Sequence, residues 1–214
     1  MPARDSVILV HGLWMNGMEM SVLRRRLEHE HGFDAHVFAY PTLHGDAGEI
    51  CRDLGDFARE RAREGGPVHM VGHSLGGAIV YKTLVGCGAP VTGNAVLLAS
   101  PLNGSRAAEG AARHPMLRPL LGPHVLRELA QPRGRRAWSK GAALGAIAGS
   151  MRMGTGRFFA HFDEDNDGSV AVSETVIPGL SDHIVLPHSH MGMIFAADVA
   201  AQVAHFLRTA RFEK

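Results

Sequence analysis

The chain has 214 residues, of which 45% are apolar and 20% are charged, a composition typical of a soluble globular protein. This length suffices for one well-buried core and is short for two, so we expect a single domain over residues 1–214. The formal charge of +1 argues against nucleic acid as a partner, and the longest apolar runs are far below the roughly 18 residues that a transmembrane segment needs.

The beginning of the chain and its cysteines bear on the cellular compartment. A strand-like run starts at Ser6, which leaves no room for a secretory signal peptide before it. Cys51 and Cys87 cannot form a disulfide framework, and we interpret them as two thiols. We therefore expect a cytoplasmic protein.

Strands and helices alternate along the chain. Ser6–Val10 is a continuous apolar run closed by His11 and Gly12, which predicts a strand buried on both faces. Apolar residues at helical spacing predict a surface helix over 17–31. The elements expected after it are strand 35–40, helix 46–63, strand 68–72, helix 75–85, strands 95–100, 143–148 and 183–186, and helix 193–207. This order predicts an α/β fold with a mostly parallel, doubly wound sheet.

Residues 101–140 interrupt the alternation with proline, glycine and arginine between short apolar patches. We expect a short lid-like insertion over the carboxyl edge of the sheet. Its basic cluster, Arg133, Arg135, Arg136 and Lys140, is interpreted as a solvated loop rather than a phosphate or membrane contact.

The pentapeptide Gly72-His-Ser74-Leu-Gly76 matches the Gly-x-Ser-x-Gly pattern of a nucleophile elbow, a strained strand-to-helix turn that exposes a serine hydroxyl. Sequence matching alone is weak here, because a glycine-rich turn can produce the pattern by chance. The context is specific, since an apolar strand precedes the motif and an apolar helix follows it. We expect Ser74 to be a nucleophile.

A serine nucleophile needs a base to take its proton and a third group to orient that base. The order serine, acid, histidine leads to the acidic loop 163–167 for the acid and to His188 or His190 for the base. We favour His190, which lies between the last strand and the last helix, because His188 directly follows Pro187 at the strand end.

An oxyanion hole needs two backbone N–H groups aimed at the developing charge. Leu75, the residue after the expected nucleophile, supplies one. The loop after the first strand supplies the other, since Gly12 allows a turn that presents the N–H of Leu13 or, as the less favoured choice, Trp14.

Together these motifs resemble small bacterial α/β-hydrolases of the lipase and esterase type. The matching segments are Val10-His-Gly-Leu13, Gly72-His-Ser-Leu-Gly-Gly77, Ala99-Ser-Pro-Leu-Asn-Gly-Ser105, Asn166-Asp-Gly-Ser-Val170 and His190-Met-Gly-Met193. The resemblance implies Ser74 as nucleophile, Asp167 as acid, His190 as base, and Leu13 and Leu75 as oxyanion donors. It is loose in the insertion after residue 101 and over 150–162. It also implies a compact hydrolase sheet, one that lacks the first two strands because the oxyanion strand already starts at Ser6.

A competing motif overlaps the acid loop. Asp163-x-Asp165-x-Asp167-Gly168-x5-Glu174 matches the EF-hand calcium loop. Three observations weaken it: the residues after Glu174 are β-branched and end at a proline, no second loop exists, and calcium on Asp167 would withdraw the charge that a triad needs. A calcium-binding interaction module built on 163–174 remains the alternative, as does a structural calcium on Asp163 and Asp165.

The pocket is expected to be apolar. Trp14 and Met191 flank the oxyanion loop and the base, and we expect both, together with Met193, to contact substrate. The sequence therefore predicts a serine hydrolase that cleaves small-molecule carboxylic esters through an acyl-enzyme intermediate, with no metal and no cofactor. A thioesterase or acyltransferase with the same triad is the alternative within this class.

Overall fold

The computed structural model describes residues 4–86, 92–116, 118–129, 134, 136–154 and 162–214. Within these residues six strands form one sheet in the order β2-β1-β3-β4-β5-β6, and every neighbouring pair is parallel. The strands are β1 (Ser6–Val10), β2 (Asp34–Phe38), β3 (Val68–His73), β4 (Ala95–Leu98), β5 (Leu144–Gly149) and β6 (Asp182–Leu186). The predicted α/β fold with a parallel sheet is confirmed.

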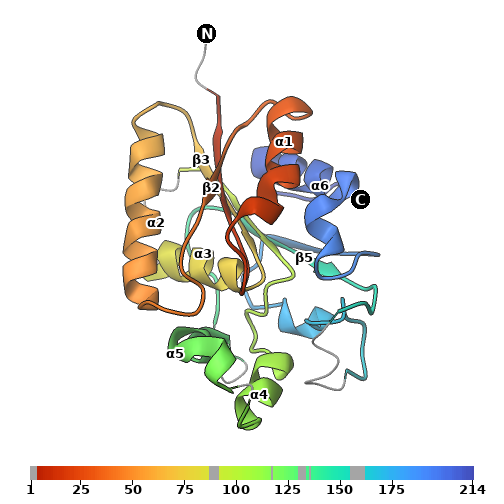
Figure 1. The fold of residues 1–214 in the computed structure, drawn as a ribbon. Coiled ribbons are helices and arrows are strands. Elements are labelled where there is room, and N and C mark those ends of the chain that lie inside the picture. The colour runs from red at the N-terminus through yellow and green to blue at the C-terminus, as the bar shows by residue number, and fades with distance from the viewer. Residues whose placement is uncertain (1–3, 87–91, 117, 130–133, 135, 155–161) are drawn as a thin grey trace.

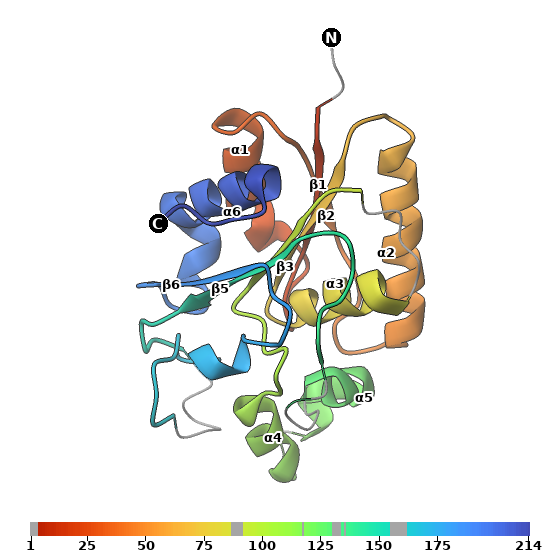
Figure 2. The same cartoon turned by 180° about the vertical axis from the view of Figure 1, so that it is seen from behind.

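Helices cover both faces of this sheet (Figures 1 and 2). One face carries α1 (Ser21–His29) and α6 (Ala197–Thr209), and the other carries α2 (Ala47–Ala62) and α3 (Leu75–Gly86). In β1, Val7 and Leu9 pack with the first pair of helices, whereas Ile8 and Val10 pack with the second pair. Because both faces are covered, β1 is apolar at every one of these positions.

The strand order places a topological switch point between β1 and β3. The chain leaves β1 through α1 to reach β2 on one side, and then returns through α2 to β3 on the other side. Val10 and Gly72 are partners in the β1–β3 register, so the loops after these two strands begin side by side. Ligands of open α/β sheets bind in the crevice at such a point.

The insertion contains two helices that the sequence analysis does not predict, α4 (Arg106–Arg113) and α5 (Arg118–Leu129). Ser105 caps α4, because its hydroxyl oxygen accepts a hydrogen bond from the Ala108 N–H at 3.1 Å. Gly122 has φ 70° and ψ 154° and divides α5 into two pieces. The apolar residues of α5 therefore do not follow one continuous helical period in the sequence. Both helices lie below the carboxyl edge of the sheet in Figure 1.

The predicted closing helix begins later than expected. Gly192–Phe195 forms a short 3-10 helix, and Ala196 is extended before α6 starts at Ala197. As a result, Met193 is fully buried in the core on the α1 and α6 face, so the expectation that it contacts substrate is wrong.

The basic cluster in the insertion is only partly a solvated loop. Lys140 is exposed, but the Arg136 guanidinium donates a hydrogen bond to the Glu128 carbonyl oxygen at 2.7 Å and lies over the Tyr81 ring. Every helix in the described parts of the chain is too short or too polar to cross a membrane. Outside the described residues lie Cys87, Arg133 and Arg135.

Candidate active site

Ser74 occupies the turn between β3 and α3 in a left-handed conformation, with φ 54°. This conformation is uncommon for a residue with a side chain and stores strain that the surrounding structure must hold. The Ser74 N–H donates to the Leu98 carbonyl oxygen at 2.9 Å, and its own carbonyl accepts from the Gly77 N–H at 3.1 Å. The turn is therefore fixed by the neighbouring strand and by the first turn of α3.

Three glycines make this turn possible by letting backbones approach closely. A Cβ on Gly76 would overlap the carbonyl oxygens of Val10 and His11, and one on Gly72 would overlap the backbone of Gly77. At Gly77 the added atom would collide with the Ser100 hydroxyl. The start of α3 thus packs directly against β1, which is why the elbow pattern requires glycine at these positions.

Asp167 and His190 form a hydrogen-bonded pair. The distance from His190 Nδ1 to Asp167 Oδ2 is 2.8 Å, and the Asp167 side chain is 1% exposed. The other carboxylate oxygen, Oδ1, accepts from the N–H groups of Ser169 at 2.8 Å and Val170 at 2.7 Å. With Nδ1 held by the carboxylate, Nε2 of His190 is the nitrogen that remains for proton transfer.

The loop of the expected acid (residues 163–170, the acid loop) and the loop of the expected base (residues 187–191, the base loop) are also joined through their backbones. The His190 N–H donates to the Asp167 carbonyl oxygen at 3.0 Å, and the Asp167 N–H donates to the Val170 carbonyl oxygen at 3.1 Å. Gly168 has φ 93°, and a Cβ there would overlap the backbone of Gly154. The Asp167-Gly168 sequence is therefore a tight turn that orients the carboxylate toward His190.

His188 and His183 have other partners. His188 Nε2 lies 2.8 Å from a carboxylate oxygen of Asp198, at the start of α6. His183 Nε2 lies 2.9 Å from the Thr175 hydroxyl. The structure thus brings His190, and not His188, to Asp167.

The calcium-binding alternative has little support in this geometry. Both oxygens of Asp167 are occupied as described, and Glu174 is a buried acceptor for backbone and guanidinium N–H groups. Asp165 is exposed and lies 3.7 Å from Arg152. Among the described residues, the ligand atoms that converge closely enough for a metal ion belong to another group, on β2 and after α2.

The loop expected to donate to an oxyanion, residues 11–17 after β1 (the oxyanion loop), lines the cavity with Gly12, Leu13, Trp14 and Met15. The Trp14 N–H donates to the Thr42 hydroxyl oxygen at 3.1 Å, so it is not directed at a substrate oxygen. Leu75 is the first residue of α3, where a backbone N–H has no partner within the helix. Of the two donors considered after Gly12, the geometry favours Leu13.

His11 and Tyr40 hold this loop in place, a role that the sequence analysis does not predict. The Tyr40 N–H donates to His11 Nε2 at 3.1 Å, and the Tyr40 hydroxyl donates to the His11 carbonyl oxygen at 2.9 Å. Because Nε2 accepts, Nδ1 carries the proton and donates to the Gly12 carbonyl oxygen at 3.0 Å. Burial lowers the pKa of His11 and so keeps this tautomer neutral.

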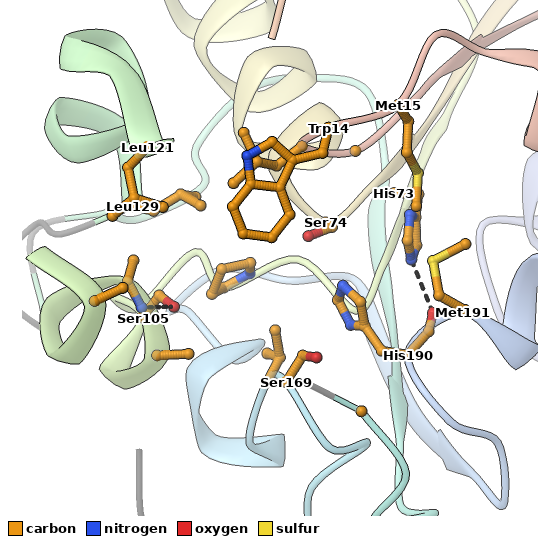
Figure 3. Close-up of a pocket in the computed structure, with 18 of the residues that line it drawn as sticks. Trp14, Met15, His73, Ser74, Ser105, Leu121, Leu129, Ser169, His190 and Met191 are labelled. Carbon is orange, nitrogen blue, oxygen red and sulfur yellow. Dashed lines mark hydrogen bonds between the residues drawn. The ribbon is translucent and has the colours of Figure 1, made fainter. Parts of the chain in front are cut away.

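A mostly apolar cavity of about 290 Å³ lies in front of Ser74 and His190 (Figure 3). Its walls come from the oxyanion loop, the two insertion helices, the acid loop, the base loop and the segment around Met153. The residues that line it include Leu13, Trp14, Met15, Ser74, Ala107, Ala108, Ala111, Leu121, Leu129, Met153, Ser169, His190 and Met191. Of the three expected substrate contacts, Trp14 and Met191 thus line the cavity. The sequence does not predict the contribution of α4 and α5, because it depends on how the insertion folds back onto the sheet.

Comparison with known proteins places this fold among hydrolases. The sequence model of the Alpha/beta hydrolase family matches residues 7–208. No curated protein matches the chain by sequence. The structure is similar to the mature form of Bacillus licheniformis lipase BlEst2, with a TM-score of 0.74 and 20% identity over 91% of this chain and 88% of that one.

Two other solved structures are similar over most of this chain. Phospholipase PlaB from Legionella pneumophila has a TM-score of 0.69 at 18% identity, covering 96% of this chain and 60% of its own. The metagenomic carboxyl esterase MGS0156 has a TM-score of 0.66 at 18% identity, covering 89% of this chain and 65% of its own. The present chain therefore spans less than two thirds of these two relatives, and at such identities the likeness extends to the fold alone.

Proposed function

This chain belongs to the Alpha/beta hydrolase family, and from that premise we propose that it is a serine hydrolase that cleaves carboxylic esters through a Ser74-His190-Asp167 triad. Family membership supports hydrolase activity in general. The observation that carries the finer proposal is the 2.8 Å Asp167–His190 hydrogen bond beside a cavity that Ser74 lines from a strained turn.

In the proposed reaction, the Ser74 hydroxyl oxygen attacks the acyl carbon while its proton passes to His190 Nε2. The carbonyl oxygen gains the negative charge and accepts hydrogen bonds from the N–H groups of Leu13 and Leu75. His190 then returns the proton to the leaving alcohol, and an acyl-Ser74 ester remains. A water molecule, deprotonated by His190, attacks the acyl carbon of that ester. His190 then returns the proton to the Ser74 oxygen as the bond to the acyl carbon breaks, which releases the acid and regenerates the Ser74 hydroxyl. Asp167 holds the imidazole in the required tautomer and stabilises the imidazolium.

The pocket supports an apolar acyl group of modest size. Its volume of about 290 Å³ is at the small end for a ligand site, and most of its lining is apolar. In this proposal the whole chain is one domain, and residues 101–140 are a lid-like insertion whose helices form one wall. Thioester hydrolysis or acyl transfer to another alcohol would use the same groups and is the second candidate.

A fluorophosphonate probe tests the nucleophile. We expect covalent labelling of the wild-type protein and of Ser21→Ala, a control on α1, and no labelling of Ser74→Ala.

Asp167→Asn and His190→Ala should each reduce the turnover of p-nitrophenyl esters by orders of magnitude with little change in melting temperature. A series of p-nitrophenyl esters of increasing chain length, run with and without a calcium chelator, then separates the candidates. Absence of labelling together with calcium-dependent melting would favour the calcium-binding module.

A further inference from the structure

His73, the last residue of β3, touches three parts of the candidate site. Its side chain is fully buried, and its Nε2 lies 2.9 Å from the backbone carbonyl oxygen of His190. The two imidazole rings are tilted by 46° with centroids 4.8 Å apart. On the other side of the ring, a Cβ on Gly12 would lie 3.2 Å from His73 Nδ1, so the ring also contacts the oxyanion loop. Figure 3 shows His73 between Met15 and the base loop.

The hydrogen bond fixes the protonation of His73. A carbonyl oxygen only accepts, so Nε2 must carry a proton and donate it. Burial, with the nearby His190 as a smaller cause, lowers the pKa of His73 to about 3. The ring is therefore neutral. Its Nδ1 atom carries a lone pair and is buried without a hydrogen-bond partner in the described part of the chain. Because His73 stays neutral, a proton taken up during the reaction resides on His190 alone.

The topology explains why such a contact is needed. Ser74 follows β3, His190 follows β6, and β4 and β5 lie between these strands. Neighbouring strands are about 4.8 Å apart, so the two strand ends are separated by roughly 14 Å. The base loop must fold back across the sheet to reach Ser74, and the sheet itself does not fix how far it returns.

We propose that His73 is a positioning residue, which holds the His190 loop at the correct distance from Ser74 by donating a hydrogen bond to the His190 backbone. This inference rests on the proposed function. His190 is then held at three points. Its backbone N–H donates to the Asp167 carbonyl oxygen at 3.0 Å, and its Nδ1 is hydrogen-bonded to the Asp167 carboxylate at 2.8 Å. The third point is the His190 carbonyl oxygen, which accepts the hydrogen bond from His73. Because His73 directly precedes Ser74 in the chain, this bond ties the base to the residue next to the proposed nucleophile.

Three variants test the role of this hydrogen bond. His73→Phe keeps a ring of similar size but lacks the N–H, whereas His73→Gln can still present an N–H to the carbonyl. His69→Phe is the matched control, since His69 is a buried histidine of the same strand that bonds to Asn94 away from the cavity. Should His73→Phe fail to fold, His73→Met takes its place, because methionine fills irregular space and also lacks the donor.

With p-nitrophenyl butyrate, we expect kcat of His73→Phe to fall on the order of 100-fold with little change in KM, as for a misplaced catalytic group. His73→Gln should recover most of this loss, and His69→Phe should keep the wild-type kcat even if its melting temperature falls. Wild-type kcat in His73→Phe, or an equal loss in the Phe and Gln variants, would overturn the proposal.

Proton NMR gives a readout that does not need turnover. In the wild-type protein we expect a downfield resonance from the His190 Nδ1–H bonded to Asp167, and in His73→Phe we expect the same resonance to broaden by exchange with water. If wild-type protein neither hydrolyses esters nor reacts with fluorophosphonate, yet this resonance depends on His73, then the proposed function is wrong and the positioning role stands. If esters are hydrolysed and both the resonance and kcat survive in His73→Phe, then the positioning role is wrong.

Discussion

Glu174 binds Arg106 at two points, since its Oε1 accepts the Arg106 backbone N–H at 2.8 Å and the guanidinium Nε–H at 2.9 Å. Its other oxygen accepts the Ala171 N–H at 3.0 Å. Arg106 begins α4, which forms a wall of the cavity, and Ala171 follows the Asp167 turn. The carboxylate that completes the EF-hand pattern in the sequence thus joins the pocket wall to the acid loop.

Removing this carboxylate should destabilise the protein. In Glu174→Ala, the Ala171 N–H would lose its acceptor, and Arg106 would keep its hydrogen bonds to Glu164 and Ser173 and its contact with the Phe162 ring. We expect the free energy of unfolding to fall by about 2–4 kcal/mol, measured by urea denaturation. Glu109→Ala, which removes a surface ion pair on the same helix, should cost less than about 1 kcal/mol. Equal costs for the two variants would show that Glu174 contributes no more than a surface carboxylate.

Thr42 should matter for turnover although it does not line the cavity. It is buried, and its hydroxyl holds the Trp14 N–H, where the backbone has φ 63°. Without that acceptor, the loop that we propose presents the Leu13 N–H to the oxyanion would be less well fixed. We expect Thr42→Val to lower kcat for p-nitrophenyl butyrate about 10-fold, a smaller effect than loss of an oxyanion donor itself. Thr42→Ser keeps the hydroxyl and should stay within about twofold of wild type. A Thr42→Val variant with wild-type kcat would mean that this bond does not shape the oxyanion loop.

Local patterns in the sequence were sufficient for the sheet and for the turn at Ser74. The apolar run of β1 and the glycines around Ser74 act within a few residues, so their consequences can be predicted without knowing the rest of the fold. The roles of His73 and Glu174 depend instead on partners more than 60 residues away. The sequence does not predict α5 for a different reason, because Gly122 interrupts its helical periodicity.

The histidines that are buried in neutral form should make the protein sensitive to acid. For His73 the pKa is about 3 in the folded protein, against an ordinary value of 6.5. Above pH 6.5 both states are neutral at this residue and stability is unaffected. As the pH falls below 6.5, the unfolded chain binds a proton that the folded protein does not bind until about pH 3. The free energy of unfolding should therefore decrease by up to about 1.4 kcal/mol per pH unit for this residue alone.

Urea denaturation at pH 7, 6 and 5 checks this contribution. His73→Phe lacks the titrating group, so its stability should fall less steeply with acid than that of the wild-type protein. Near pH 5 the difference in slope should approach about 1.4 kcal/mol per pH unit. Burial also lowers the pKa of His11 and of His69. Because both residues are present in His73→Phe, the stability of the variant should still decrease somewhat as the pH falls. Parallel slopes for the two proteins would contradict a neutral, buried His73.

Gly76 is the position in the elbow where a single methyl group should be least tolerated. Its added Cβ would overlap two backbone carbonyl oxygens, those of Val10 and His11, and neither can rotate away as a side chain could. To relieve the overlap, α3 must move away from β1, which displaces both Ser74 and the Leu75 N–H. We expect Gly76→Ala to lose about 3 kcal/mol of stability and, for a chain of this length, roughly 6–12 °C in melting temperature.

Gly141→Ala is the matched control, because Gly141 is exposed and nothing lies within 4 Å of its added Cβ. That variant should melt within about 2 °C of wild type. If both variants melt together, the close approach of α3 to β1 does not limit the residue at position 76.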